Sequence, residues 1–206
     1  MNTLIVNCYL GKEMPKSLVE ALGKFSNCQV IHYSEISEDY VVANNVDTIV
    51  LSGSAARIVS PVQREMYRGT INLVKSTNLP IFGICFGHQL LCWAFGAEVG
   101  SISLPVLNRF EKMRIIVTDG LFSGFSSSQP VYVAESHYDY VLEESLSSAG
   151  FELLADSASC PVEAVKHKLK PVYGVQFHPE RTKIKNESHD EGIQIIENFF
   201  KNAIEH

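Results

Sequence analysis

The 206-residue sequence lacks an excess of basic residues, and it lacks any cysteine pair at short spacing. Its 23 acidic and 17 basic residues give a formal net charge of −6, which argues against a nucleic-acid binder, because such a protein needs a basic face. None of the five cysteines forms a C-x-x-C pair of the kind that binds zinc or acts as a redox dithiol. We therefore predict no metal site and a reduced, cytoplasmic compartment.

Long apolar segments are also missing. The N-terminus has no basic region followed by a long apolar stretch, so we predict no signal peptide. The most apolar stretch, residues 81–97, is shorter than the ~20 residues that a membrane-spanning helix needs, and it contains three glycines. We interpret it as a buried strand, a tight turn and a buried helix. No repeat, low-complexity tract or linker divides the chain, so we predict a single domain, residues 1–206.

The first hundred residues contain a regular alternation of apolar runs and helix-like stretches. Strands that are apolar throughout and alternate with helices are typical of a parallel sheet covered on both faces. After Gly100 the apolar runs follow one another more closely, which indicates antiparallel or mixed pairing. Strands are predicted at 4–8, 29–33, 48–51, 80–84, 114–118, 130–135, 152–155, 162–166 and 172–177, and helices at 17–25, 64–76 and 90–95.

The chain closes with a predicted helix whose expected N-cap is Ser188, with Glu191 at the capping-box position. The fold class that we predict is α/β. It has a mostly parallel, doubly wound central sheet with helices on both faces and a smaller mixed or antiparallel sheet.

Cys85 lies where a predicted strand passes into a predicted helix, in the sequence Gly83-Ile84-Cys85-Phe86-Gly87. This G-x-C-x-G pattern has the form of a nucleophile elbow with Cys in place of Ser. The glycines matter because the turn is sharp and a Cβ on either side would collide with neighbouring chain. The N-terminus of the following helix favours a thiolate. The alternative is a structural cysteine, since Cys is among the most buried residue types.

His178 and Glu180 follow a predicted buried strand in the sequence Gly174-Val175-Gln176-Phe177-His178-Pro179-Glu180. The proline biases the backbone of His178 towards an extended conformation, in which side chains at i and i+2 point the same way. A carboxylate beside an imidazole fixes its tautomer and stabilises its charged form, which is the second half of a catalytic triad. A surface turn with a structural histidine is the alternative. The combination with the Cys85 elbow favours a triad.

Three motifs together resemble those of the class I (triad) glutamine amidotransferases. They are Leu51-Ser52-Gly53-Ser54, residues 83–89 and residues 174–180, and the resemblance covers essentially the whole chain. The family hydrolyses the side-chain amide of glutamine and passes ammonia to a synthase partner or domain, on a flavodoxin-like fold. Residues 135–141, with an S-H-x-D-x-V pattern, and residues 160–167 resemble segments of the glutaminase subunits of two-subunit GMP synthases.

The resemblance implies a role for each matching residue. Cys85 would attack the glutamine carboxamide, His178 would transfer the protons, and Glu180 would orient His178. Backbone N–H groups of Phe86 and of the Gly53-Ser54 loop would form the oxyanion hole. The α-amino and α-carboxylate groups of glutamine would be held by Gln89, Ser136, His137 and Tyr138.

The same resemblance implies a heterodimer. An ATP-pyrophosphatase subunit that adenylates xanthosine monophosphate would be a separate chain, and ATP and Mg would bind only there. This chain would then carry no cofactor and would bind neither nucleic acid nor membrane. The sequence contains no P-loop-like motif, which agrees with that division of labour.

Two features depart from the family pattern. The oxyanion loop reads Leu51-Ser52-Gly53-Ser54-Ala55 where the family usually reads L-S-G-G-P, and serine would be strained there if the position needs φ > 0. Residues 181–187 form a polar, charged stretch just beyond the triad. The alternative functions are a stand-alone γ-glutamyl hydrolase that uses the same triad, and a non-catalytic interaction protein that retains the scaffold.

Overall fold

The computed structural model describes residues 1–118, 120–126 and 129–204. A nine-stranded sheet runs through it in the order β2-β1-β3-β4-β9-β8-β7-β5-β6. The first five strands of that order pair in parallel, and the pairs from β9 to β6 are antiparallel. The strands are β1 (Asn2–Asn7), β2 (Asn27–His32), β3 (Thr48–Leu51), β4 (Ile81–Ile84), β5 (Val99–Ile115), β6 (Val131–Val141), β7 (Phe151–Ser157), β8 (Ala164–His167) and β9 (Val172–Val175).

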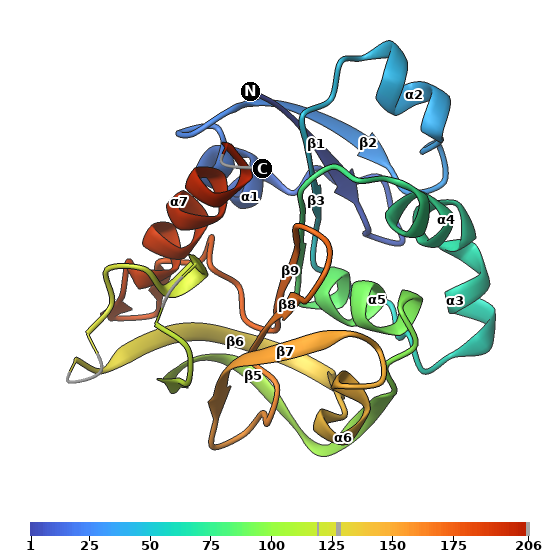
Figure 1. Cartoon of the computed structure of the whole chain (residues 1–206). Coiled ribbons are helices and arrows are strands. Elements are labelled where there is room, and N and C mark those ends of the chain that lie inside the picture. The colour runs from blue at the N-terminus through green and yellow to red at the C-terminus, as the bar shows by residue number, and fades with distance from the viewer. Residues whose placement is uncertain (119, 127–128, 205–206) are drawn as a thin grey trace.

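Helices cover both faces of the parallel strands, as predicted for this α/β fold (Figure 1). Leu4 and Val6 of β1 pack in one apolar cluster with residues of α4 and α5, whereas Ile5 packs in a second cluster with α1 and α7. Both faces of β1 are therefore buried, which explains its unbroken apolar sequence. The helices are α1 (Lys16–Leu22), α2 (Glu38–Ala43), α3 (Pro61–Met66), α4 (Arg68–Ser76), α5 (Phe86–Ala94), α6 (Glu143–Leu146) and α7 (Glu191–Ile204), with a 3-10 turn η1 (Gly120–Phe122).

The antiparallel strands continue the parallel part of the sheet and form a layer that crosses beneath it (Figure 1). The long strand β5 was predicted only at its end, over residues 114–118. Along β5 only Val106 and Met113 are buried, and most of the other side chains are exposed. A strand whose side chains mostly face solvent has no apolar alternation by which its sequence could reveal it.

The helix predicted over residues 64–76 is two helices. Ser60 accepts a hydrogen bond from Gln63 N at 3.4 Å and caps α3, which begins at Pro61. The break falls at Tyr67, which is fully buried and whose hydroxyl donates to the carbonyl oxygen of Cys8 at 2.6 Å. A tertiary hydrogen bond of this kind fixes the break, and no local pattern in the sequence marks it.

The predicted cap of the last helix was wrong. Ser188 lies in the short strand β11 (Glu187–Ser188), which pairs with β10 (Lys183–Ile184) in an antiparallel ribbon. Helix α7 begins three residues later, at Glu191, whose carboxylate accepts from Tyr132 N at 3.4 Å. The polar stretch over residues 181–187 is thus mostly this ribbon.

Candidate active site

Three loops meet at one edge of the sheet because β3, β4 and β9 are neighbouring parallel strands. The carboxyl ends of parallel strands lie at the same edge, where α/β proteins bind their ligands. Gly53 follows β3, Cys85 follows β4 and His178 follows β9. They border a pocket of about 470 Å³ lined by Tyr9, Leu10, Gly11, Glu13, Gly53, Ser54, Ala55, Ala56, Arg57, Cys85, Gln89, Ser136, His137, Tyr138, Asp139, His178 and Arg181.

Cys85 occupies a sharp turn between β4 and α5. Its φ of 51° and ψ of −107° form a conformation that residues with a Cβ rarely adopt, and such strain is characteristic of active-site residues. A Cβ on Gly83 would lie 2.5 Å from the side chain of Leu91, and one on Gly87 would collide with the carbonyl oxygen of Leu51. Both flanking glycines are therefore required by close packing.

His178 and Glu180 lie side by side just beyond β9. Nδ1 of His178 is 2.9 Å from Oε1 of Glu180, and both side chains are buried. The backbone N–H of His178 donates to the carbonyl oxygen of Ala134 at 2.8 Å, which anchors this segment to β6. The imidazole borders the same pocket as the Cys85 thiol. The arrangement is that of a nucleophile, a base and a group that orients the base.

The charges of the pair are set by this contact. Burial lowers the pKa of His178, but the carboxylate of Glu180 and the sulfur of Cys85 outweigh burial and raise the pKa to about 10. Burial raises the pKa of Glu180, and the imidazolium outweighs it and lowers the pKa. At neutral pH the structure therefore holds His178 as an imidazolium paired with the Glu180 carboxylate.

The residues predicted for the oxyanion hole border the sulfur. Phe86 is the first residue of α5, so its N–H is among those that have no acceptor within the helix. A Cβ on Gly53 would lie 2.9 Å from Cε1 of His178 and 3.6 Å from Cβ of Cys85, so only glycine fits there. Ser54 does not have a positive φ, so serine at this position causes no backbone strain.

The predicted substrate-binding residues line the same pocket but differ in their surroundings. Gln89 donates through Nε2 to the carbonyl oxygen of Asp139 at 2.8 Å and to Oε1 of Gln176 at 3.0 Å, which leaves its own Oε1 as an acceptor. Ser136 presents its carbonyl oxygen, 3.7 Å from Sγ of Cys85. His137 is buried, and Tyr138 is 45% exposed at the rim.

Residues that sequence reasoning did not single out also contribute. Gln176 donates through Nε2 towards Sγ of Cys85 at 3.7 Å, and it lay inside a recognised motif without a role. Arg57 forms a paired contact with Asp139. Asp139 is the fourth residue of the S-H-x-D-x-V segment, and this aspartate was the one sequence signal that could have led to Asp139 as a site residue. Nothing in the local sequence marks Arg57 or Tyr9.

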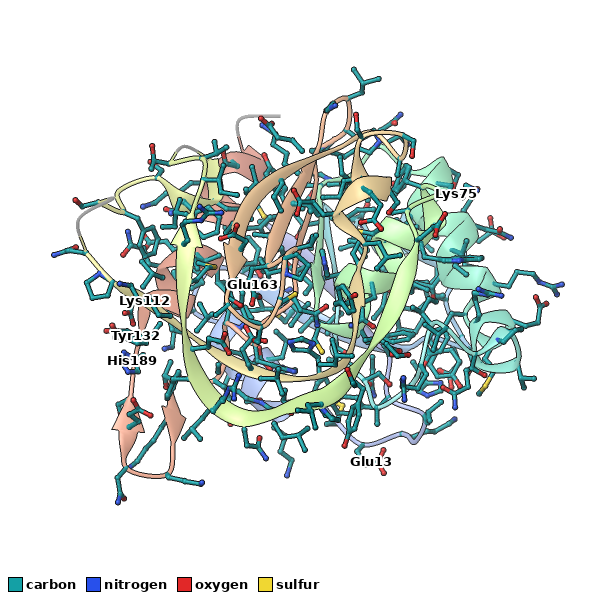
Figure 2. The ribbon with its side chains drawn as sticks, turned by 90° about the horizontal axis from the view of Figure 1, so that it is seen from below. Glu13, Lys75, Lys112, Tyr132, Glu163 and His189 are labelled. Carbon is teal, nitrogen blue, oxygen red and sulfur yellow. The ribbon has the colours of Figure 1, made fainter. Side chains whose placement is uncertain are left out.

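Two buried carboxyl groups lie behind the pocket. Glu135 and Glu163 are fully buried and lie against each other, and Oε2 of Glu135 is 3.2 Å from Nε2 of His137. Figure 2 shows Glu163 deep among the side chains of the interior. Burial raises the pKa of Glu135 to about 8, and burial and the neighbouring Glu135 raise that of Glu163 well above its ordinary value. The pair therefore retains a proton at neutral pH.

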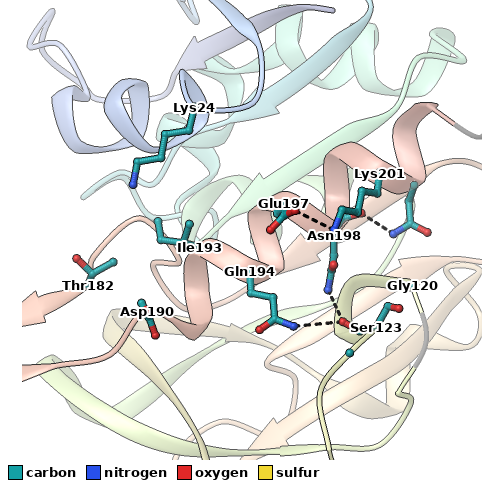
Figure 3. A pocket seen from close by; sticks show the side chains of 12 residues that line it. Lys24, Gly120, Ser123, Thr182, Asp190, Ile193, Gln194, Glu197, Asn198 and Lys201 are labelled. Carbon is teal, nitrogen blue, oxygen red and sulfur yellow. Dashed lines mark hydrogen bonds and ion pairs between the residues drawn. The ribbon is translucent and has the colours of Figure 1, made fainter.

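A larger hollow of about 920 Å³ lies along α7, near η1 and Lys24 (Figure 3). It contains none of the predicted site residues. Its amides are bound within the protein, since Gln194 and Asn198 both donate to the carbonyl oxygen of Ser123, at 3.4 and 2.8 Å. Its charges of opposite sign include the ion pair Lys201–Glu197 at 2.8 Å. Nothing in this hollow resembles a reactive centre.

Within the described ranges, no cluster of three or more His, Cys, Asp or Glu side chains is arranged to hold a metal ion. In the same residues, no helix has both the length and the apolar character to cross a membrane.

Comparison with known proteins identifies the family. The model of the class I glutamine amidotransferase family matches residues 4–203. The chain is 33% identical over 162 residues to the A subunit of the glutamine-hydrolyzing GMP synthase of Methanothermobacter thermautotrophicus, covering 79% of this chain and 77% of the relative. It is also 32% identical over 184 residues to the glutamine-hydrolyzing GMP synthase of Francisella philomiragia. That match covers 89% of this chain and 32% of the relative.

A solved structure agrees with these sequence relatives. A Thermoplasma acidophilum protein, described as a proposed A subunit of GMP synthase, superposes with a TM-score of 0.82 at 25% identity, covering all of this chain and 94% of that one. Because the family model spans nearly the whole chain and the nucleophile elbow falls inside the match, this chain belongs to the class I glutamine amidotransferases.

Proposed function

We propose that this chain hydrolyses the side-chain amide of glutamine through Cys85, His178 and Glu180, and passes the ammonia to an ATP-pyrophosphatase partner that converts xanthosine monophosphate to GMP. The observation that carries the proposal is the meeting of the strained Cys85 with the His178–Glu180 pair at one pocket. The pocket of about 470 Å³ is within the usual range for a small-molecule site.

The first half-reaction forms a thioester. The sulfur of Cys85 attacks the carboxamide carbon of glutamine, and the carbonyl electron pair moves onto oxygen. The N–H groups of Phe86 and of the Gly53–Ser54 loop stabilise that oxyanion. His178 gives its proton to the nitrogen, the C–N bond breaks, and ammonia leaves a γ-glutamyl thioester on Cys85.

The second half-reaction returns the enzyme. His178, now neutral, takes a proton from water, and the hydroxide attacks the thioester carbon. The C–S bond breaks, glutamate leaves, and the proton goes back to the His178–Cys85 pair. Glu180 stays ionised throughout and holds the imidazole in one tautomer, because its contact with His178 lowers its pKa.

The synthase role rests on the relatives, several of which are named as the A subunit of GMP synthase. The segment Ser136–Asp139, which resembles their S-H-x-D pattern, forms one wall of the pocket. In this proposal ATP and Mg bind only to the partner, and this chain contributes the glutaminase site and no cofactor. The heterodimer works in the cytoplasm.

The proposal is tested by ammonia release from glutamine, with the chain alone and with the partner, xanthosine monophosphate, ATP and Mg. Activity should be lost in Cys85→Ala, and GMP formation should then continue only when free ammonia is supplied. Glutaminase activity that survives Cys85→Ala refutes the mechanism. Preference for γ-glutamyl peptides over glutamine, without a partner, identifies the alternative γ-glutamyl hydrolase.

A further inference from the structure

Arg57 joins the loop that follows β3 to the strand β6 across the pocket. Its Nε donates to Oδ2 of Asp139 at 2.7 Å and one terminal nitrogen donates to Oδ1 at 2.5 Å, which is the two-point geometry of a fork-to-carboxylate pair. The same terminal nitrogen donates to Ser101 Oγ at 2.9 Å, and Ser101 Oγ donates to Asp139 Oδ1 at 2.9 Å. The two partners are 82 residues apart in sequence.

The loop that Arg57 ends is the one that, in the proposed function, supplies N–H groups to the oxyanion. It begins at Gly53, which packs against His178, and it continues through Ser54, whose hydroxyl accepts from Ala56 N at 3.0 Å. The N–H of Arg57 donates to Oε1 of Gln63 at 2.5 Å. Arg57 follows Ser54 closely in the sequence, so the position of the guanidinium constrains the position of the Ser54 peptide.

Asp139 connects this loop to the opposite wall of the pocket. Its side chain is 2% exposed, whereas that of Arg57 is 37% exposed. Its carbonyl oxygen accepts from Gln89 Nε2 at 2.8 Å and lies 3.1 Å from His137 Nδ1. Asp139 therefore binds Arg57 through its carboxylate, and its backbone carbonyl oxygen contacts the side chains of Gln89 and His137, which line the pocket.

We propose that Arg57 is a positioning residue that latches the Gly53–Ala56 loop to Asp139 and so fixes the loop's N–H groups for the oxyanion. The inference rests on the proposed function, because it concerns the oxyanion of glutamine hydrolysis. Lysine would not replace Arg57, since an ammonium group is a single point of charge and cannot make the paired contact. Arg57 acts through the loop and does not react itself.

The test is steady-state glutamine hydrolysis by Arg57→Ala. Removing one oxyanion donor typically lowers kcat about 10²–10³-fold, and we expect a misplaced loop to cost about tenfold or more in kcat. KM should stay within about threefold, since transition-state stabilisation is what is lost. Added guanidinium at millimolar concentration should restore part of kcat in Arg57→Ala only. In NMR spectra of the folded variant, the backbone amide signals of Gly53 and Ser54 should shift from their wild-type positions.

Arg114→Ala is the matched control, because Arg114 makes the same kind of fork with Asp156 in a pair that links β5 to β7. It should keep wild-type kcat. If Arg57→Ala fails to fold, Arg57→Lys carries the test and must also lose kcat. An unchanged kcat, or a rise in KM alone, overturns the latch and makes Arg57 structural or substrate-binding. A wild-type protein that hydrolyses no glutamine, alone or with its partner, instead refutes the proposed function.

Discussion

At the scale of single residues, the buried pair Glu135 and Glu163 is the most unusual chemistry outside the pocket. No arginine or lysine is paired with either carboxyl group in the described residues, and Ser157 donates to Glu163 at 2.6 Å. Two carboxylates buried together cannot both ionise at low cost. We therefore expect the two groups to share one proton, with His137 beside them and its Nδ1 directed to a backbone carbonyl oxygen.

This proton makes the stability of the protein depend on pH. The pKa of Glu135 is raised from its ordinary value of 4.5 to about 8, so the folded state holds the proton more tightly than the unfolded chain. The stabilisation is complete below the ordinary pKa and is lost as pH rises towards 8. We expect Glu135→Gln, which cannot ionise, to flatten the fall in unfolding free energy over that range, by up to about 1.4 kcal/mol per pH unit.

Urea unfolding from pH 5 to pH 8 measures the effect. His178 contributes its own pH dependence to both proteins, because its pairing with Glu180 is kept in Glu135→Gln. The control is Glu152→Gln, because Glu152 is exposed on β7. A Glu135→Gln profile as steep as that of the wild type would contradict the shared proton.

At the scale of elements, helix α7 is seated directly on the catalytic segment. A Cβ on Gly192, the second residue of α7, would lie 2.7 Å from Cα and 2.9 Å from the carbonyl carbon of Pro179. Pro179 stands between the two members of the triad that the motif predicted. The glycine therefore permits a close approach of helix to loop that no other residue allows.

Gly192→Ala should consequently reverse the usual effect of alanine in a helix. Alanine normally stabilises a helix by up to about 1 kcal/mol over glycine. At position 192 the clash is with backbone, so we expect lower unfolding free energy and at least a severalfold loss of glutaminase activity, because His178 and Glu180 move.

Gly69→Ala is the matched control, since Gly69 is also the second residue of its helix, α4, and its nearest neighbour, Ile36 O, would be 3.5 Å from the new Cβ. It should be neutral or stabilising and fully active. Thermal melting and ammonia release compare the two variants. Equal behaviour of the two alanine variants would show that α7 does not constrain the triad.

Helices and strands were predictable where their burial leaves a pattern of apolar residues in the sequence. The parallel strands and the turn at Cys85 follow from apolar runs and glycines, because both faces of that part of the sheet are covered. β5 and the break at Tyr67 were missed for the opposite reason. β5 has few buried side chains, and the break depends on a hydrogen bond to Cys8, nearly sixty residues away. The helix N-cap predicted at Ser188 was wrong because Ser188 pairs with Lys183 in the β10–β11 ribbon, and the helix begins only after that ribbon.

At the scale of the whole molecule, the strand order β3-β4-β9 assembles the candidate active site, which no single motif could do. It brings together Gly53, Cys85 and His178, which the sequence separates by many tens of residues. The motifs therefore predicted Gly53, Cys85 and His178, and the structure brings these three residues to one pocket. They did not predict the Arg57–Asp139 latch or the Glu135–Glu163 pair, because those contacts arise between elements whose packing only the fold determines.

The fold also sorts the five cysteines. Burial raises the pKa of Cys8 to about 12, and it raises those of Cys92 and Cys160 well above the ordinary value, so these thiols are unreactive in the folded protein. Cys28 is half-buried, away from the pocket, and Cys85 alone borders the imidazole of His178.

A chloroketone analogue of glutamine should therefore add once to the folded protein, at Cys85. Intact-mass measurement and peptide mapping should find a single adduct, none in Cys85→Ala, and slower addition in His178→Ala, which lacks the base that the proposed mechanism places beside the sulfur. A general alkylating agent in urea should reach all five thiols, which shows that the selectivity belongs to the fold. Preferential labelling of Cys28, or a labelling rate that does not fall when excess glutamine is added, would mean that the pocket does not recognise the substrate. The chain would then be a scaffold that has kept the amidotransferase fold without its chemistry.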